Sequence, residues 1–134
     1  MTHLDSTFLV DLLRERRRNR RGPASAKLET LRLIELAMSI FAVCELWTGV
    51  ERAADKTAER ERVDTLCQTI ETVYPDEKLA PEYARLLTAL ERRGQRIGTM
   101  DLLIAASAVA AGAPLVTRNA REFSRIPELR VISY

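Results

Sequence analysis

Apolar residues recur along this chain in two patterns, short buried runs and longer faces at helical spacing. The short runs predict strands at His3–Asp5, Met38–Val43, Thr72–Pro75, Leu115–Thr117 and Arg130–Tyr134. The stretches between them carry apolar residues three and four positions apart, which predicts helices, among them Ala24–Glu35 and Leu79–Arg93. Strands that alternate with helices predict an α/β fold with a mostly parallel sheet covered by helices on both faces.

The segment after Gly98-Thr99-Met100-Asp101 is the most apolar in the chain. No charged residue follows Asp101 until Arg118, so a helix here would be apolar all round and buried on every side. Asp101 stands where this helix should begin, close to the positive end of the helix dipole. A buried carboxylate needs a partner, which marks Asp101 as a candidate functional residue.

Composition predicts one ordinary globular domain spanning residues 1–134. The chain is 46% hydrophobic and 30% charged, and its net charge is only +2, from 21 basic and 19 acidic residues. The beginning of the chain lacks the pattern of a secretory signal, and the longest charge-free run is too short to cross a membrane. We therefore expect a cytoplasmic protein without a membrane partner, with Cys44 and Cys67 as reduced, packed thiols.

A basic cluster follows the first predicted helix and ends at the Gly22-Pro23 breaker. It contains six arginines in eight positions: Arg14, Arg16, Arg17, Arg18, Arg20 and Arg21. Favourable interaction with the carboxyl end of a helix accounts for two or three cations. The excess favours a patch that contacts phosphates, although a solvated helix end is the alternative.

Polar side chains gather at the ends of the predicted strands. Asp5, Asn119 and Glu122 follow strands, Glu45 lies in the first turns of a helix after a strand, and Asp101 begins the helix before the fourth strand. If the first and fourth strands are neighbours, these residues converge, because ligand sites form outside the carboxyl ends of parallel strands. Clustered carboxylates without Cys or His predict Mg²⁺ or Mn²⁺, which suits phosphodiester hydrolysis.

Four blocks of sequence together resemble the PIN-domain ribonucleases, most closely the VapC-type toxins of toxin-antitoxin pairs. The blocks are Leu4-Asp5-Ser6-Thr7, Ser39 with Glu45-Leu46 and Gly49, Gly98 to Ala106, and Val116 to Phe123. They occur in the family's order and span nearly the whole chain. The resemblance implies a three-layer α/β/α sandwich, a homodimer, cleavage of RNA with Mg²⁺ or Mn²⁺, and inhibition by a cognate antitoxin protein.

The resemblance also assigns roles to individual residues. Asp5, Glu45 and Asp101 match the metal-binding acids, and Thr117 matches a polar residue after the fourth strand. Asn119 occupies a position where many members carry a further aspartate, and Glu122 would then supply the missing charge. Ser6 and Thr117 would orient substrate, Ser6-Thr7 would position Asp5, and Arg118 would join the basic cluster in binding RNA. Because of Asn119, the rival interpretation is a catalytically impaired PIN-like module that binds RNA or protein.

Overall fold

The computed structural model describes all 134 residues and contains one sheet of five parallel strands. The strands lie in the order β3-β2-β1-β4-β5. Their bounds are Thr2–Leu4 (β1), Leu36–Ser39 (β2), Glu71–Val73 (β3), Leu115–Val116 (β4) and Val131–Ile132 (β5). β1 is central and pairs with β4 through His3–Leu115 and Leu4–Val116. The first and fourth strands are therefore neighbours, which is the arrangement that the candidate site requires.

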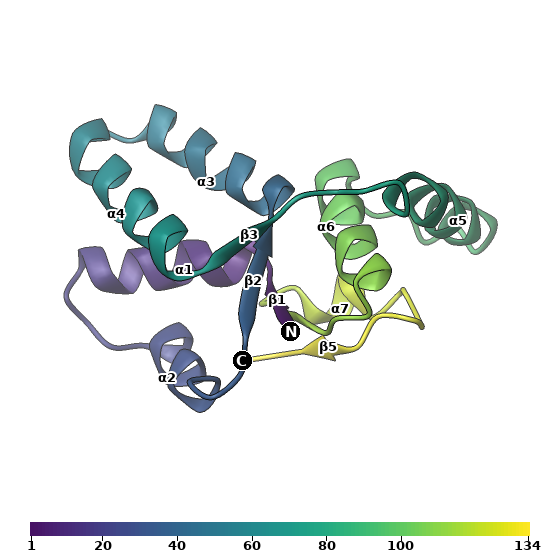
Figure 1. Ribbon diagram of the computed structural model, residues 1–134, viewed down its shortest axis with the longest axis horizontal. Helices are drawn as coiled ribbons and strands as arrows, with labels where there is room; N and C mark the ends of the chain where they lie inside the picture. The colour runs from purple at the N-terminus through teal and green to yellow at the C-terminus, as the bar shows by residue number, and fades with distance from the viewer.

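Helices cover both faces of the sheet, so the fold is the expected α/β/α sandwich (Figure 1). α1 to α4 lie to the left of the sheet in Figure 1, and α5 to α7 to the right. Their bounds are Ser6–Arg17 (α1), Pro23–Thr30 (α2), Ile40–Arg52 (α3), Lys56–Thr69 (α4), Leu79–Arg92 (α5), Thr99–Ala110 (α6) and Ala120–Phe123 (α7). The chain steps from β1 through β2 to β3, then crosses to β4 and β5. Right-handed crossovers in these opposite directions place the two groups of helices on opposite faces.

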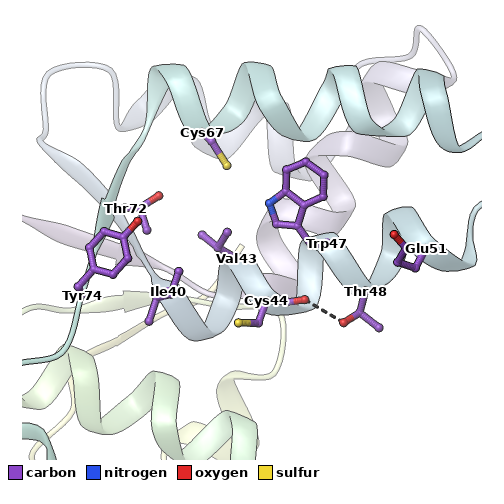
Figure 2. Close-up of a pocket in the computed structure, with 9 residues that line it drawn as sticks. All are labelled: Ile40, Val43, Cys44, Trp47, Thr48, Glu51, Cys67, Thr72 and Tyr74. Carbon is purple, nitrogen blue, oxygen red and sulfur yellow. Dashed lines mark hydrogen bonds between the residues drawn. The ribbon is translucent and has the colours of Figure 1, made fainter.

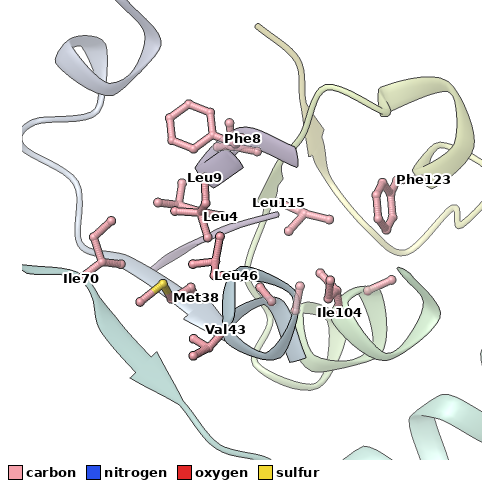
Figure 3. Packing of buried hydrophobic residues seen from close by; sticks show 14 of the residues in the cluster. Leu4, Phe8, Leu9, Met38, Val43, Leu46, Ile70, Ile104, Leu115 and Phe123 are labelled. Carbon is pink, nitrogen blue, oxygen red and sulfur yellow. The ribbon is translucent and has the colours of Figure 1, made fainter. Parts of the chain in front are cut away.

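The hydrophobic core joins the sheet to the helices on both sides (Figure 3). Phe8 of α1 and Phe123 of α7 are fully buried, as are strand residues such as Leu4 and Leu115. No residue of α6 from Met100 to Ala110 is exposed, as its apolar composition predicts. The end of α6 that carries Asp101 is therefore held firmly by packing.

Three local predictions were wrong. The apolar run Met38–Val43 is divided between β2 and α3, because the Ser39 side chain accepts a hydrogen bond from the Ala42 amide and caps a helix that begins at Ile40. The helix predicted to reach Glu35 ends at Thr30, leaving Leu33 91% exposed. Cys44 is exposed and not packed, since it lies on the outer side of α3.

The strand order places a topological switch point between β1 and β4. The chain leaves β1 toward α1 on one face, and it leaves the neighbouring strand β4 toward α7 on the other face. A gap opens between two such diverging connections, and open α/β sheets bind their ligands there. The residues that follow β1 and β4, Asp5 and Thr117, meet at this switch point, where the Thr117 hydroxyl donates to Asp5 at 2.7 Å. None of the helices has both the length and the apolar composition needed to cross a membrane.

Candidate active site

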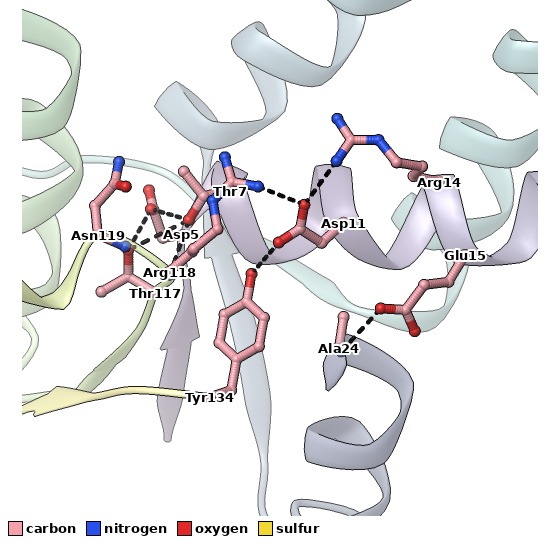
Figure 4. A network of polar contacts seen from close by, with 10 residues as sticks. All are labelled: Asp5, Thr7, Asp11, Arg14, Glu15, Ala24, Thr117, Arg118, Asn119 and Tyr134. Atoms are coloured by element: carbon pink, nitrogen blue, oxygen red, sulfur yellow. Dashed lines mark hydrogen bonds and ion pairs between the residues drawn. The ribbon is translucent and has the colours of Figure 1, made fainter. Parts of the chain in front are cut away.

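Asp5 directly follows β1 and is completely buried. Its Oδ2 accepts hydrogen bonds from the hydroxyls of Thr7 and Thr117, each at 2.7 Å (Figure 4). Its Oδ1 is buried and has no hydrogen-bond partner. Asp5 also occupies the N-cap position of α1 but makes no capping hydrogen bond with its side chain. A plain helix-capping role for Asp5 is therefore excluded, and one of its oxygens remains unsatisfied.

Glu45 reaches the site from the second turn of α3. Its Oε1 accepts a hydrogen bond of 2.8 Å from the Ser6 hydroxyl at the start of α1. Of the Ser6-Thr7 pair that we expected to position Asp5, only Thr7 contacts it, because Ser6 is directed toward α3 and holds Glu45 instead. The pair thus fixes two acids on different elements.

Asp101 lies in the first turn of α6, close to three other carboxylates. Its pKa is raised from the usual 3.8 to about 6, mainly by burial and then by the negative charges of Asp5, Glu122 and Glu45. Only charges that lie near one another interact in this way across a protein. The charges of Asp5 before α1, Glu45 of α3 and Glu122 of α7 thus all act on Asp101 at the start of α6.

The segment after β4 supplies the remaining side of the site. The Thr117 hydroxyl, besides donating to Asp5, accepts the amide of Asn119 at 3.0 Å. Asn119 begins α7, and its side chain lies on the same side of the network as Asp5 in Figure 4. Glu122 follows in the first turn of α7, where its charge acts on Asp101.

The four carboxylates lack a positively charged partner. Every ion pair in the protein involves other acids, namely Asp11, Glu29, Glu51, Glu59, Glu82 and Glu128. No three His, Cys, Asp or Glu side chains are already arranged at metal-binding geometry, so the carboxylates would have to draw together around an ion. The donor set nevertheless fits a hard divalent cation, because all donors are oxygens and Oδ1 of Asp5 is unsatisfied.

The predicted basic cluster divides into paired and unpaired arginines. Arg14 and Arg118 both pair with Asp11, at 3.2 and 2.7 Å, Arg17 pairs with Glu59 at 3.6 Å, and Arg21 pairs with Glu29. The three arginines that form no ion pair are exposed: Arg16, Arg18 and Arg20. Arg118, the additional arginine expected to bind RNA, directly follows Thr117. It therefore places one end of the basic surface beside the carboxylate site.

A larger hollow lies elsewhere, between α3, α4 and β3 (Figure 2). It measures about 890 Å³ and is lined mainly by apolar side chains, including Val43, Trp47 and Tyr74. Neither Asp5 nor Asp101 lines it. We place the chemistry at the carboxylates because Glu51 is the only charged residue that lines the hollow. Trp47 is partly buried at its wall.

The sequence patterns did not indicate two polar residues beside the site, Asp11 and Tyr134. Asp11 accepts hydrogen bonds from Arg14, Arg118 and the Tyr134 hydroxyl, the last at 2.6 Å (Figure 4). Thr7 was noted only as part of a pair. The helical spacing of Asp5 and Asp11 gave no signal, because the partners of Asp11 come from the other end of the chain.

The fold and the position of these acids define the class of protein. It is an α/β/α domain with a carboxylate site at the carboxyl ends of its parallel strands. The family model of the PIN domain matches residues 3–129. The chain belongs to the PIN-domain family, which confirms the fold and the family that the four sequence blocks predict.

Individual relatives agree with this assignment. Ribonuclease VapC2 of Rickettsia felis is 38% identical over 94 residues, 70% of each chain. Ribonuclease VapC1 of Haemophilus influenzae is 28% identical over 127 residues, 95% of this chain and 92% of that one. The crystal structure of VapBC2 from Rickettsia felis, bound to a DNA fragment from its promoter, matches with a TM-score of 0.90 and 30% identity over 99% of this chain and 98% of that one.

Proposed function

We propose that this protein is a metal-dependent endoribonuclease and the toxin of a type II toxin-antitoxin pair. The observation that carries the proposal is the group of four carboxylates without a cationic partner, in which Asp5 has an unsatisfied oxygen and Asp101 has a raised pKa. Such a group is unfavourable by itself and favourable around a divalent cation. The relatives named ribonuclease VapC support the substrate class.

Asp5, Glu45 and Asp101 would hold the cation, with Glu122 as a further ligand. PIN-domain ribonucleases depend on metal in general, and the all-oxygen donor set favours Mg²⁺ or Mn²⁺ over zinc. When bound, such a cation lowers the pKa of a coordinated water and neutralises charge that develops on the phosphate oxygens.

The protein's own residues perform the remaining tasks. Thr7 and Thr117 fix one oxygen of Asp5, so that the other stays directed at the ligand position. Ser6 fixes Glu45 in the same way. The side chain of Asn119 is uncharged and would orient substrate, while Glu122 compensates for the charge that an aspartate at 119 would add. Catalytic geometry of this kind must be held by supporting contacts before substrate arrives.

We also infer a cognate antitoxin and a homodimer as the assembly. The Rickettsia felis relative was solved as VapBC2 bound to DNA from its promoter, and a Haemophilus influenzae relative as VapBC-1, with a TM-score of 0.86 and 26% identity. A high structural similarity over almost the whole chain supports the same assembly here. Light scattering of the purified chain alone, and together with the product of an adjacent small reading frame, tests both partners.

The test of the activity compares two glutamates on the same helix. Glu45→Gln removes a proposed metal ligand, whereas Glu51→Gln changes an exposed glutamate that only pairs with Lys56 at 3.4 Å. Wild-type protein and Glu51→Gln should cleave single-stranded RNA with Mg²⁺ or Mn²⁺, and EDTA should stop the reaction. Glu45→Gln should cleave at least about 100-fold more slowly, because charge stabilisation at phosphorus is lost.

Each result decides between the proposal and its rival. Equal cleavage by Glu45→Gln and wild type would remove Glu45 from the site. Absence of cleavage by the wild type, together with RNA binding that is unaffected by metal, would identify the catalytically impaired module that Asn119 suggested.

A further inference from the structure

A second hollow of about 440 Å³ lies at the end of α1, beside the carboxylate site. Five arginines line it: Arg14 from α1, Arg18, Arg20 and Arg21 from the turn that follows, and Arg118 from the segment after β4. Its two acidic residues are Asp11 and Glu15. The side chains around this hollow, which we call the arginine pocket, thus carry a net charge of +3.

Neither carboxylate is free to neutralise the unpaired arginines. Asp11 already accepts Arg14, Arg118 and Tyr134. The Glu15 carboxylate accepts hydrogen bonds from the backbone amides of Gly22, Ala24 and Ser25, and also from the Ser25 hydroxyl. Arg18 and Arg20 therefore face the pocket without any ion pair. Uncompensated guanidinium groups repel one another, so their gathering here indicates an anionic ligand.

The turn after α1 holds these arginines in place. The amide of Asn19 bonds to the carbonyl of Arg16 at 3.1 Å, and that of Arg20 bonds to the carbonyl of Glu15 at 3.0 Å. Asn19 has a φ of 50°, a left-handed conformation that asparagine tolerates. This pattern is a Schellman motif, which turns the chain back beside its own helix. Arg18 and Arg20 stand on either side of Asn19 in a closed turn instead of in an open loop.

The pocket is also connected to the carboxylate site (Figure 4). The amide of Arg118 donates to the Thr7 hydroxyl at 3.1 Å, and that hydroxyl donates to Asp5 at 2.7 Å. The guanidinium of Arg118 meanwhile pairs with Asp11 at the pocket. One residue thus borders both the site of proposed cleavage and the arginine pocket.

We propose that the arginine pocket binds a backbone phosphate of the RNA strand next to, and distinct from, the phosphate that is cleaved. This inference rests on the proposed ribonuclease function and adds a second contact for the same strand. A phosphate is favoured over a stacked base because the hydroxyl of Tyr134 is bonded to Asp11 and its ring packs edge-on against Phe8, with centroids 5.1 Å apart. Guanidinium groups match phosphate oxygens in geometry and charge.

The test measures binding without cleavage, in protein that carries Asp101→Asn. In this background, Arg18→Ala with Arg20→Ala removes the two unpaired arginines of the pocket. The matched control, Arg60→Ala with Arg92→Ala, removes the same charge from exposed positions on α4 and α5. Affinity for a single-stranded RNA of about 12 nucleotides is measured by fluorescence anisotropy at several salt concentrations, and circular dichroism verifies folding.

We expect the pocket variant to bind roughly tenfold more weakly at low salt, with a salt-dependence slope smaller by about 0.7, the value for one lost phosphate contact on a single strand. The control should keep the slope. A dinucleotide, which has one phosphate only, should bind the pocket variant and the control equally. Identical losses in both variants with the long RNA would overturn the pocket while cleavage by wild-type protein still stands. Failure of the ribonuclease proposal would instead appear as no cleavage of RNA by the wild-type protein with Mg²⁺ or Mn²⁺, whether or not the pocket variant loses affinity.

Discussion

Ionised Asp101 destabilises the folded protein, because it is partly buried among other negative charges. Burial and the nearby charges of Asp5, Glu122 and Glu45 raise its pKa to about 6, so ionising Asp101 costs more in the folded protein than in the unfolded chain. A pKa raised by this amount corresponds to roughly 1–3 kcal/mol once partial exposure is allowed for. The packing of α6 supplies the free energy that keeps the carboxylate in place. Such a residue is retained for what it binds and not for stability.

Asp101→Asn should therefore stabilise the metal-free protein while it abolishes cleavage. In the wild type, the folded state binds a proton at Asp101 up to about pH 6, whereas the unfolded state releases it near pH 3.8. Stability must then fall as pH rises between these values, and the deficit stays constant above pH 6. The variant should gain roughly 1–3 kcal/mol at pH 7, less a few tenths for the lost interaction with the helix dipole.

Urea unfolding in EDTA at pH 4, 5, 6 and 7 measures this gain. Asp64→Asn is the control, because Asp64 is exposed on α4 and makes no ion pair. The gain from Asp101→Asn should be close to zero at pH 4 and largest at pH 7, and the control should show no such trend. A variant that is less stable than wild type at pH 7 would show that the acids do not repel one another.

At the residue scale, sequence identified the acids but not what holds them. Asp5 and Asp101 could be selected because a carboxylate beside an apolar run is unusual. The hydrogen bonds from Thr7 and Thr117 could not, since threonine at a helix start or strand end is common and their pairing joins positions 110 residues apart. Supporting contacts depend on tertiary geometry, which spacing along the chain does not encode.

At the scale of elements, one carboxylate ties α2 to α1. Glu15 accepts four hydrogen bonds from the first residues of α2 and the glycine before it. Burial acts to raise its pKa, but these hydrogen bonds outweigh burial and lower it below 4.5. Gly22 approaches closely, since a Cβ there would lie 2.7 Å from atoms of the Glu15 carboxylate. Glycine is required at this junction by proximity and not by its backbone conformation.

Glu15→Gln and Gly22→Ala should destabilise the protein through the same contact. Each change disturbs the carboxylate that caps α2, and we expect a loss of about 1–2 kcal/mol for either. Because Glu15 has a lowered pKa in the folded state, its contribution is present above its unfolded pKa and is lost as pH falls. The double variant should lose clearly less than the two single losses combined. Chemical unfolding of the four proteins at pH 7 measures the coupling, and strictly additive losses would show that Gly22 does not act through Glu15.

The order of elements could be predicted, and several of their boundaries could not. Alternating apolar runs predicted all five strands and the buried helix α6. The run Met38–Val43 was ambiguous because a buried strand and a buried helix share the same composition over a few residues. The hydrogen bond from the Ala42 amide to the Ser39 side chain fixes the boundary between β2 and α3. A serine inside an apolar run is a weak signal for a helix start unless that hydrogen bond is known.

At the scale of the molecule, the site exists because β1 and β4 are neighbours. Their pairing brings Asp5 to Thr117, at the point where the chain leaves the two strands toward opposite faces of the sheet. Sequence could state this pairing only as a condition, because strand order depends on crossovers longer than any local pattern. The resemblance of four blocks to one family, confirmed by the match over residues 3–129, is what made the convergence of the acids predictable.

Metal should stabilise the whole fold, and its effect should depend on pH. An ion that binds only the folded state adds about 2.7 kcal/mol at a concentration 100 times its dissociation constant. Protons compete for Asp101, so Mg²⁺ should bind more weakly below pH 6 and should release a proton there as it binds. Thermal unfolding with increasing Mg²⁺ at pH 5 and pH 7.5 measures both effects, with Asp101→Asn as the variant that should lose them. An equal rise in Tm for wild type and Asp101→Asn, or a larger rise at pH 5, would place the metal away from the four carboxylates, because only ions held by Asp101 must displace its proton.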